Sequence, residues 1–138
     1  RLVETLGVED RVRFLGYISE EEKISLIDSA IAVVLPTRHT GECWSLVTSE
    51  AFARGIPVIA TTIGVLPYRI KHGKTGVLVP PEDVSTLADA LSFFVNNSEE
   101  ATDPREMKEA RDLLMNWQEV SKRLEKIYKY LEHKERSR

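Results

Sequence analysis

The strongest constraint on the fold is a closely spaced series of apolar strand, helix and apolar strand between residues 31 and 60. The segments 31–35 and 57–60 are almost continuously apolar, as strands covered on both faces of a sheet are. The helical segment between them closes at Gly55, a residue typical of helix ends. Parallel strands need a long crossover of this kind, so these residues predict a β-α-β unit in a parallel sheet.

The rest of the chain alternates in the same way. Ser19, with Glu22 three residues later, forms a capping box, and Asp103 followed by Pro104 is typical of a helix start. Helices are expected at 1–6, 19–29, 66–71 and 116 to about 133. Two more helices are expected to begin at Asp83 or Ser85 and at Asp103. Strands are expected at 12–15, 31–35, 57–61 and 77–79. This alternation predicts an α/β fold, a Rossmann-like doubly wound parallel sheet with helices on both faces and right-handed crossovers.

Length and composition limit the class of protein. The 138 residues suit a single domain, expected over 1–133 with a frayed tail at 134–138, and 97–103 is the most linker-like segment. A net charge of −3 argues against a nucleic-acid partner. No apolar run reaches the roughly 18 residues of a membrane span. A lone cysteine, Cys43, fits a reducing compartment, so we expect a cytoplasmic protein. Other parts of a longer chain could hold it at the inner face of the membrane.

Two glutamates flank the start of the first crossover helix. Glu42 lies in the loop after the strand at 31–35, and Glu50 is expected about two turns inside the helix. Ligands of parallel α/β sheets bind outside the carboxyl ends of the strands, where this loop lies. The N–H groups and the dipole of a helix N-terminus favour phosphate. Backbone groups for phosphate, with carboxylates at the edges for hydroxyls, suit a nucleotide sugar.

Several longer motifs occur in a recognisable order. They are Val-Arg-Phe-Leu-Gly-Tyr at 12–17, Pro-Thr at 36–37, Glu-Ala-Phe-Ala-Arg-Gly-Ile-Pro-Val-Ile-Ala at 50–60, Gly-Lys-Thr-Gly-Val-Leu-Val-Pro-Pro at 73–81, and Trp117 with Tyr128. Over residues 11–130 the chain resembles the C-terminal, donor-binding domain of the family 4 retaining glycosyltransferases, which have the GT-B fold. The string at 50–60 followed by the Gly-x-x-Gly turn is the specific part, since two glutamates eight positions apart are common.

The resemblance implies a role for each matched position. Glu50 would accept hydrogen bonds from the ribose hydroxyls of the nucleotide, and Glu42 would hold donor-sugar hydroxyls near the reacting face as the candidate catalytic residue. The other implied residues are Ser45, Leu46 and Val47, through their N–H groups, for the diphosphate, and Gly16, Tyr17 and Ile18 for the nucleobase. The family needs no metal or other cofactor, because the helix dipole and basic side chains neutralise the diphosphate.

Two stretches depart from the family pattern. After Glu42 the family usually has a small, glycine-containing run with Phe, whereas this chain has Trp44 and then Ser45 in place of Gly. In the segment 63–69 one glycine of the usual pair is lost, and Tyr68 stands where Glu is usual. A differently shaped sugar pocket is therefore expected.

The resemblance also implies parts that precede residue 1. The family's catalytic Arg and Lys and its acceptor-binding N-terminal domain lie upstream, so we expect this chain alone to be inactive. The intact enzyme would transfer a hexose-type sugar from an NDP-sugar, with retention, to a sugar, lipid-linked or small-molecule acceptor. Two alternatives stay open: a glycogen, starch or sucrose synthase-like transferase, and a non-catalytic nucleotide-binding or interaction domain of the same fold.

Single residues allow competing interpretations. Cys43 has no His placed as a base, so a small buried residue is favoured over a nucleophile. His39 and Glu42 are too few for a metal site. Trp44 suits a pocket wall or core packing equally. Gly73 and Gly76 are expected to serve turn geometry. The last helix is expected to carry a largely buried apolar stripe, formed by Trp117, Leu124, Ile127 and Leu131. Part of this stripe would be exposed if the helix crosses to another domain.

Overall fold

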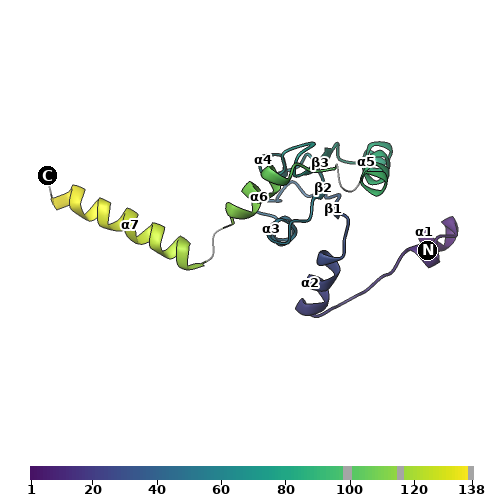
Figure 1. Cartoon of the computed structure of the whole chain (residues 1–138), viewed down its shortest axis with the longest axis horizontal. Helices are drawn as coiled ribbons and strands as arrows, with labels where there is room; N and C mark the ends of the chain where they lie inside the picture. Colours follow the sequence, from purple (N-terminus) through teal and green to yellow (C-terminus); the bar gives the residue numbers. More distant parts are fainter. Residues whose placement is uncertain (98–100, 115–116, 137–138) are drawn as a thin grey trace.

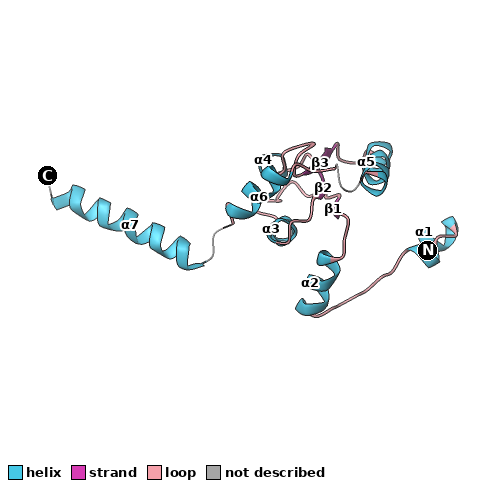
Figure 2. Ribbon diagram, in the orientation of Figure 1, coloured by secondary structure: helices cyan, strands magenta, loops and turns pink. Residues whose placement is uncertain are grey.

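The centre of the molecule is a three-stranded parallel sheet (Figures 1 and 2). The computed structural model describes residues 1–97, 101–114 and 117–136. Strand β2 (Val58–Thr61) lies between β1 (Val33–Leu35) and β3 (Gly76–Val79), with register pairs Val33 to Val58 and Val58 to Gly76. The predicted β-α-β unit is confirmed, and a second crossover continues it.

Helices cover both faces of this sheet. Val58 and Ala60 of β2 belong to one core cluster, which they share with residues of α3 (Leu46–Ala53), α4 (Leu66–Arg69) and α6 (Pro104–Asp112). Ile59, whose side chain points the opposite way, packs with residues of α5 (Val84–Asn96) in the second cluster. Figure 1 shows the strands between α5 and the other three helices. The predicted doubly wound arrangement is therefore confirmed.

Side-chain caps fix the helix starts that the sequence predicts. The Ser19 hydroxyl accepts from the Glu22 N–H at 3.2 Å, and the Glu22 carboxylate accepts from the Ser19 N–H at 2.9 Å, which completes the capping box of α2 (Glu20–Asp28). Asp83, rather than Ser85, caps α5, and Asp103 caps α6 through two N–H groups of its first turn. Each cap satisfies N–H groups that the helix itself leaves unpaired.

The strand predicted at 12–15 is wrong. Helix α1 (Leu2–Leu6) ends at Gly7 with φ +62°, and the short 3₁₀ helix η1 (Glu9–Arg11) follows it. Residues 12–15 belong to no strand, and Figure 2 draws them as part of a long loop between α1 and α2. A strand forms only where a neighbouring strand completes the hydrogen bonds. No strand in the described part of the chain pairs with these residues.

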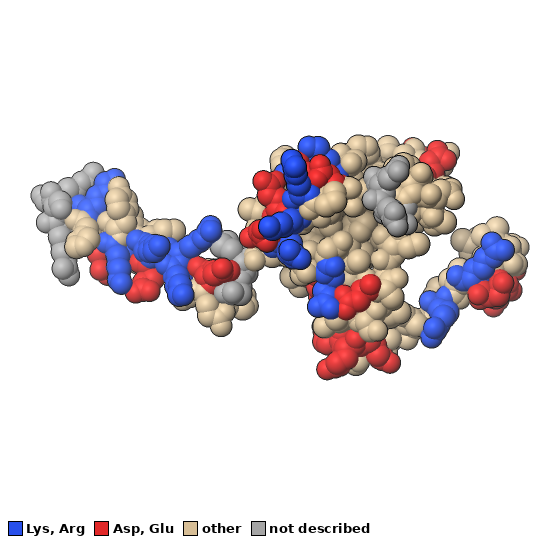
Figure 3. Space-filling model, in the orientation of Figure 1, with Lys and Arg blue, Asp and Glu red and all other residues tan. Residues whose placement is uncertain are grey.

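The C-terminal third departs from the expected boundaries. Three predicted features lie outside the described residues: 98–100 of the linker, the cap Asn116 and the end of the tail. Ala101, at the other end of the predicted linker, is buried in the core cluster that includes α5. Helix α7 (Trp117–Arg136) continues three residues beyond its predicted end and points away from the sheet (Figure 1). Its apolar stripe is exposed rather than buried, and Lys and Arg side chains line much of the face in Figure 3.

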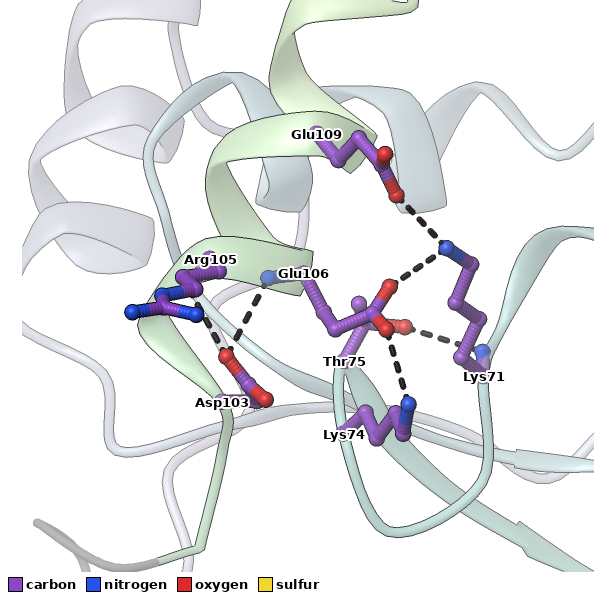
Figure 4. Close-up of polar contacts among 7 residues, drawn as sticks. All are labelled: Lys71, Lys74, Thr75, Asp103, Arg105, Glu106 and Glu109. Atoms are coloured by element: carbon purple, nitrogen blue, oxygen red, sulfur yellow. Dashed lines mark hydrogen bonds and ion pairs between the residues drawn. The ribbon is translucent and has the colours of Figure 1, made fainter.

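An ion-pair network ties the turn before β3 to α6 (Figure 4). The Lys71 ammonium contacts Glu106 and lies 2.8 Å from the Glu109 carboxylate, and Lys74 lies 2.8 Å from Glu106. The Thr75 hydroxyl accepts from the Lys71 N–H at 2.9 Å and closes the turn. The hydrogen bonds from Lys71 and then Lys74 lower the pKa of Glu106 to about 2.

The two glycines of this turn have different reasons to be glycine. Gly73 has φ +74°, a left-handed conformation that suits a residue without a Cβ. A Cβ on Gly76 would lie 2.0 Å from the Val58 carbonyl oxygen, so the close approach of β3 to β2 requires glycine there. Turn geometry is confirmed for Gly73, while Gly76 serves strand packing.

Candidate functional site

The candidate site begins at the loop between β1 and α3, which packs directly against the loop after β2. The Glu42 carbonyl accepts a hydrogen bond from the Val65 N–H at 2.9 Å. Gly64 has φ +55°, and a Cβ there would lie 2.2 Å from the Glu42 carbonyl oxygen. Only glycine allows the two backbones to approach so closely, and this contact fixes Glu42 at the carboxyl end of the sheet.

The Glu42 side chain turns toward the start of α3. One carboxylate oxygen accepts from the Ser45 N–H at 3.0 Å, and the residue is half-buried. A negative charge beside a helix N-terminus is stabilised by the helix dipole. Of the three N–H groups predicted to bind diphosphate, that of Ser45 therefore donates to Glu42. The N–H groups of Leu46 and Val47 lie in the first turn of α3, where a helix provides no backbone acceptor for them.

Ser45, the residue that precedes α3, has an unusual backbone conformation. Its φ of 52° and ψ of 84° lie in the left-handed region, and the residue is 6% exposed. The hydroxyl groups of Ser45 and Thr48 lie 2.6 Å apart, so they form a buried hydrogen bond within the first turn. A non-glycine residue with this conformation is held by its surroundings.

Arg69, at the end of α4, supplies much of that restraint. Its guanidinium donates to the Ser45 carbonyl at 3.0 Å and to the Ser49 hydroxyl at 2.9 Å, and it contacts the Trp44 carbonyl. Its carbon Cζ lies 4.6 Å from the centroid of the Trp44 ring, a cation–π contact. Burial lowers the pKa of Arg69, which remains a cation at neutral pH.

Trp44 is a pocket wall. It lines, with Arg69 and residues of α3, α4 and α6, a cavity of about 220 Å³, and its side chain is exposed. The wall also includes Phe52 and Tyr68, so the lining is largely aromatic and aliphatic. Of the two interpretations left open for Trp44, a pocket wall and core packing, the structure therefore supports the pocket wall.

Glu50 lies within α3 and is paired with a residue of α2. It is the fifth residue of the helix, just over one turn inside rather than two. The Lys23 ammonium donates to its carboxylate at 2.9 Å and lies 2.8 Å from Glu20. The hydrogen bonds that the Lys23 ammonium donates to Glu20 and then to Glu50 raise the pKa of Lys23. A bidentate pair between Arg54 and Asp28, which lowers the pKa of Asp28, also joins the two helices.

The predicted nucleobase segment lies immediately before α2. Gly16 has φ +63°, Tyr17 is fully exposed and Ile18 is half-buried. The structure therefore brings Glu42 and Ser45 into direct contact and links Glu50 to α2 through Lys23. It leaves the Tyr17 ring open to solvent.

The loop between β1 and α3 holds the residues that the sequence raised for nucleophilic or metal chemistry, Cys43, His39 and Glu42. Cys43 is exposed, so the prediction of a small buried residue is wrong; it lies in this loop rather than in the core. In the described part of the chain, no three His, Cys, Asp or Glu side chains form a group that could hold a metal ion. Among the same residues, no helix combines the length and apolar composition needed to cross a membrane.

Three site residues were missed by sequence reasoning: Lys23, Gly64 and Arg69. Gly64 carried a signal, because a lone glycine in a loop marks a positive φ or a close backbone approach. Lys23 and Arg69 carried none. Their partners in the site, Glu50 for Lys23 and residues of the α3 start for Arg69, are 20 to 27 positions away in the chain. An isolated Lys or Arg on a helix is most often a solvated residue.

Comparisons with known proteins show the family of this chain. The sequence model of a family described as glycosyl transferases group 1 matches residues 1–111. A D-inositol 3-phosphate glycosyltransferase of Corynebacterium urealyticum is 34% identical over 130 residues, which are 94% of this chain and 30% of that protein. The sucrose-phosphate synthase of Thermosynechococcus elongatus is similar in structure, with a TM-score of 0.80, 32% identity and coverage of 94% of this chain and 32% of that one.

A third similar protein has been solved with ligands. Anabaena Alr3699/HepE in complex with UDP has a TM-score of 0.68 and 26% identity, over 80% of this chain and 29% of that one. The same protein in complex with UDP-glucose has a TM-score of 0.65. The chain thus spans about a third of the length of each of these three relatives.

Proposed function

Because this chain belongs to the group 1 glycosyl transferase family, we propose that it binds a nucleoside-diphosphate sugar beside α3, as the donor-binding part of a longer glycosyltransferase. The observation that carries this proposal is the position of Glu42 at the carboxyl end of the sheet beside the first turn of α3, with Glu50 in the next turn of that helix. The complexes of Alr3699/HepE with UDP and UDP-glucose support a uridine nucleotide as the first ligand to test.

Each group in the site has a chemical task. The Leu46 and Val47 N–H groups, with the positive end of the α3 dipole, bind the diphosphate without a metal ion. Glu50 accepts hydrogen bonds from the ribose diol, for which a carboxylate has enough lone pairs. Glu42 holds hydroxyls of the donor sugar, and its hydrogen bond to Ser45 fixes the carboxylate beside the diphosphate.

The whole protein would transfer a hexose-type sugar with retention of configuration. Stabilisation of charge on the departing diphosphate is the electrostatic part of such catalysis, and α3 supplies one share of it. Further cations and the acceptor site would come from a preceding N-terminal domain, so this chain alone binds the donor without transferring it. The relative named for D-inositol 3-phosphate favours a small phosphorylated acceptor, and a cytoplasmic location fits such substrates.

Calorimetric titration of this chain with UDP, GDP, ADP and UDP-glucose tests the proposal. One diphosphate is expected to bind selectively, and saturation at about 100 times its Kd should stabilise the fold by about 2.7 kcal/mol. Glu50→Ala should abolish the response. Glu21→Ala removes an exposed carboxylate from the adjacent helix and should leave binding intact. Equal binding by wild type and Glu50→Ala, or binding of none of the nucleotides, would refute the proposed site.

A further inference from the structure

Ser45 is the one residue whose conformation decides where the first turn of α3 points. A residue with a Cβ disfavours the left-handed region, so φ +52° requires something outside the residue to impose it. The two peptide groups on either side of the Ser45 Cα carry the Trp44 carbonyl and the Ser45 carbonyl. Holding both carbonyls fixes both torsion angles of Ser45.

Arg69 holds both of them. A single guanidinium nitrogen, Nη1, donates to the Ser45 carbonyl at 3.0 Å and contacts the Trp44 carbonyl, while Nη2 donates to the Ser49 hydroxyl at 2.9 Å. The cation–π contact between the guanidinium and the Trp44 ring, 4.6 Å from Cζ to the ring centroid, adds a further restraint on the group. Arg presents two nitrogens to these three acceptors in a fixed planar fork, whereas Lys offers a single nitrogen on a flexible stem.

The orientation of these carbonyls sets the direction of the N–H groups. The peptide group is planar and trans, so the N–H of Leu46 points away from the Ser45 carbonyl. Arg69 therefore lies on the carbonyl side of this turn and aims the Leu46 N–H outward on the other side. The same geometry turns the Ser45 N–H toward the carboxylate of Glu42, 3.0 Å away.

We propose that Arg69 is a positioning residue for the diphosphate of the donor, acting through the left-handed conformation of Ser45 rather than by contact with phosphate. This inference rests on the proposed function, which assigns the diphosphate to the first turn of α3. It gives Arg69 a task that its charge alone does not explain, because its donors are directed at backbone carbonyls and a hydroxyl.

The test combines Arg69→Met, Arg69→Lys, Ser45→Gly and the double variant of Ser45→Gly with Arg69→Met. Calorimetry measures the Kd for UDP, GDP and ADP, and Arg111→Met on α6 controls for the loss of one cation. Both Arg69 variants should weaken binding about tenfold, because Ser45 leaves the left-handed region. The double variant should recover most of this loss, because glycine adopts that region without help. The control should bind like wild type.

Two results would overturn the inference. One is unchanged affinity in Arg69→Met. The other is full affinity in Arg69→Lys together with no recovery in the double variant, which would mean that the cation acts on phosphate directly.

A separate measurement distinguishes failure of this inference from failure of the proposed function. If wild type binds none of the nucleotides, the proposed function fails for this chain, and NMR of the free protein still decides the role of Arg69. The backbone chemical shifts of Ser45 should leave the left-handed pattern in Arg69→Met, with a change at the neighbouring Leu46, and both should stay unchanged in Arg111→Met. Identical shifts in wild type and Arg69→Met would overturn the positioning role.

Discussion

Gly64→Ala is the substitution whose cost the structure defines most sharply. The left-handed φ of +55° costs roughly 1–2 kcal/mol for a residue with a Cβ. The new methyl group would also lie 2.2 Å from the Glu42 carbonyl oxygen, and relief of such overpacking typically costs about 1–3 kcal/mol. We therefore expect Gly64→Ala to lower the free energy of unfolding by about 2–5 kcal/mol.

Gly55→Ala is the matched control for this prediction. Gly55 has φ +74° at the end of α3, but a Cβ there would meet nothing within 4 Å. Its cost should be the conformational part alone, about 1–2 kcal/mol. Urea unfolding followed by tryptophan fluorescence gives both values, compared at constant m-value. Equal destabilisation by the two substitutions would refute the close contact between the loops at Gly64 and Glu42.

The same pair of variants links stability to the site. Displacement of the loop at Gly64 moves Glu42 and its hydrogen bond to Ser45, whereas Gly55 lies at the opposite end of α3. UDP affinity, measured by calorimetry under conditions where both variants are folded, should fall in Gly64→Ala and be preserved in Gly55→Ala. An equal affinity in both would show that Glu42 is not held through Gly64.

Three further predictions concern other parts of the molecule. Lys23→Met frees the Glu50 carboxylate from its ion pair and should weaken UDP binding about threefold in calorimetry. Lys126→Met on α7 is the control and should bind UDP like wild type. Equal UDP affinities of Lys23→Met and wild type would contradict the prediction. Phe94→Ala empties a buried position of the α5 core and should lower the free energy of unfolding by about 3–5 kcal/mol in urea; a loss below about 1 kcal/mol would count against the packing described. Glu106→Gln tests pH dependence: because the folded-state pKa of Glu106 is lowered to about 2, its stabilisation is complete above the ordinary value of 4.5 and is lost as pH falls toward 2. The difference in Tm between wild type and Glu106→Gln should therefore shrink from pH 6 to pH 2, and a constant difference would contradict the network.

Local signals in the sequence were sufficient for most of the fold. The strands at 33–35 and 58–61 and the capping residues Ser19 and Asp103 depend on residues within a few positions, so pattern and propensity identify them. Burial on both faces, expected for both strands, holds for β2 and is wrong for β1, where Val34 is exposed. The predicted strand at 12–15 failed because a strand is a property of a pair, and its own residues do not reveal whether a neighbour is present. The exposure of Cys43 depends on how far its loop extends beyond the sheet, which composition does not specify.

The candidate site was predictable only where its residues act through the local chain. The positions of Glu42 and the first turn of α3 follow from the β-α-β unit. The contacts of Lys23 with Glu50 and of Arg69 with Ser45 depend on how separate helices pack. Ser45 could be recognised as a departure from the family pattern, but its left-handed backbone and the guanidinium that holds it became visible only in three dimensions.

NMR titration of the ¹⁵N-labelled chain with UDP would test the central claim most directly. If the donor binds at the start of α3, the amide signals of Leu46, Val47 and Glu50 should shift together and saturate with a single Kd. The amides of the turn at 71–75, which is tied to α6, should remain unchanged. Shifts confined to other parts of the chain, or none at concentrations up to the millimolar range, would contradict a nucleotide-sugar site at this position.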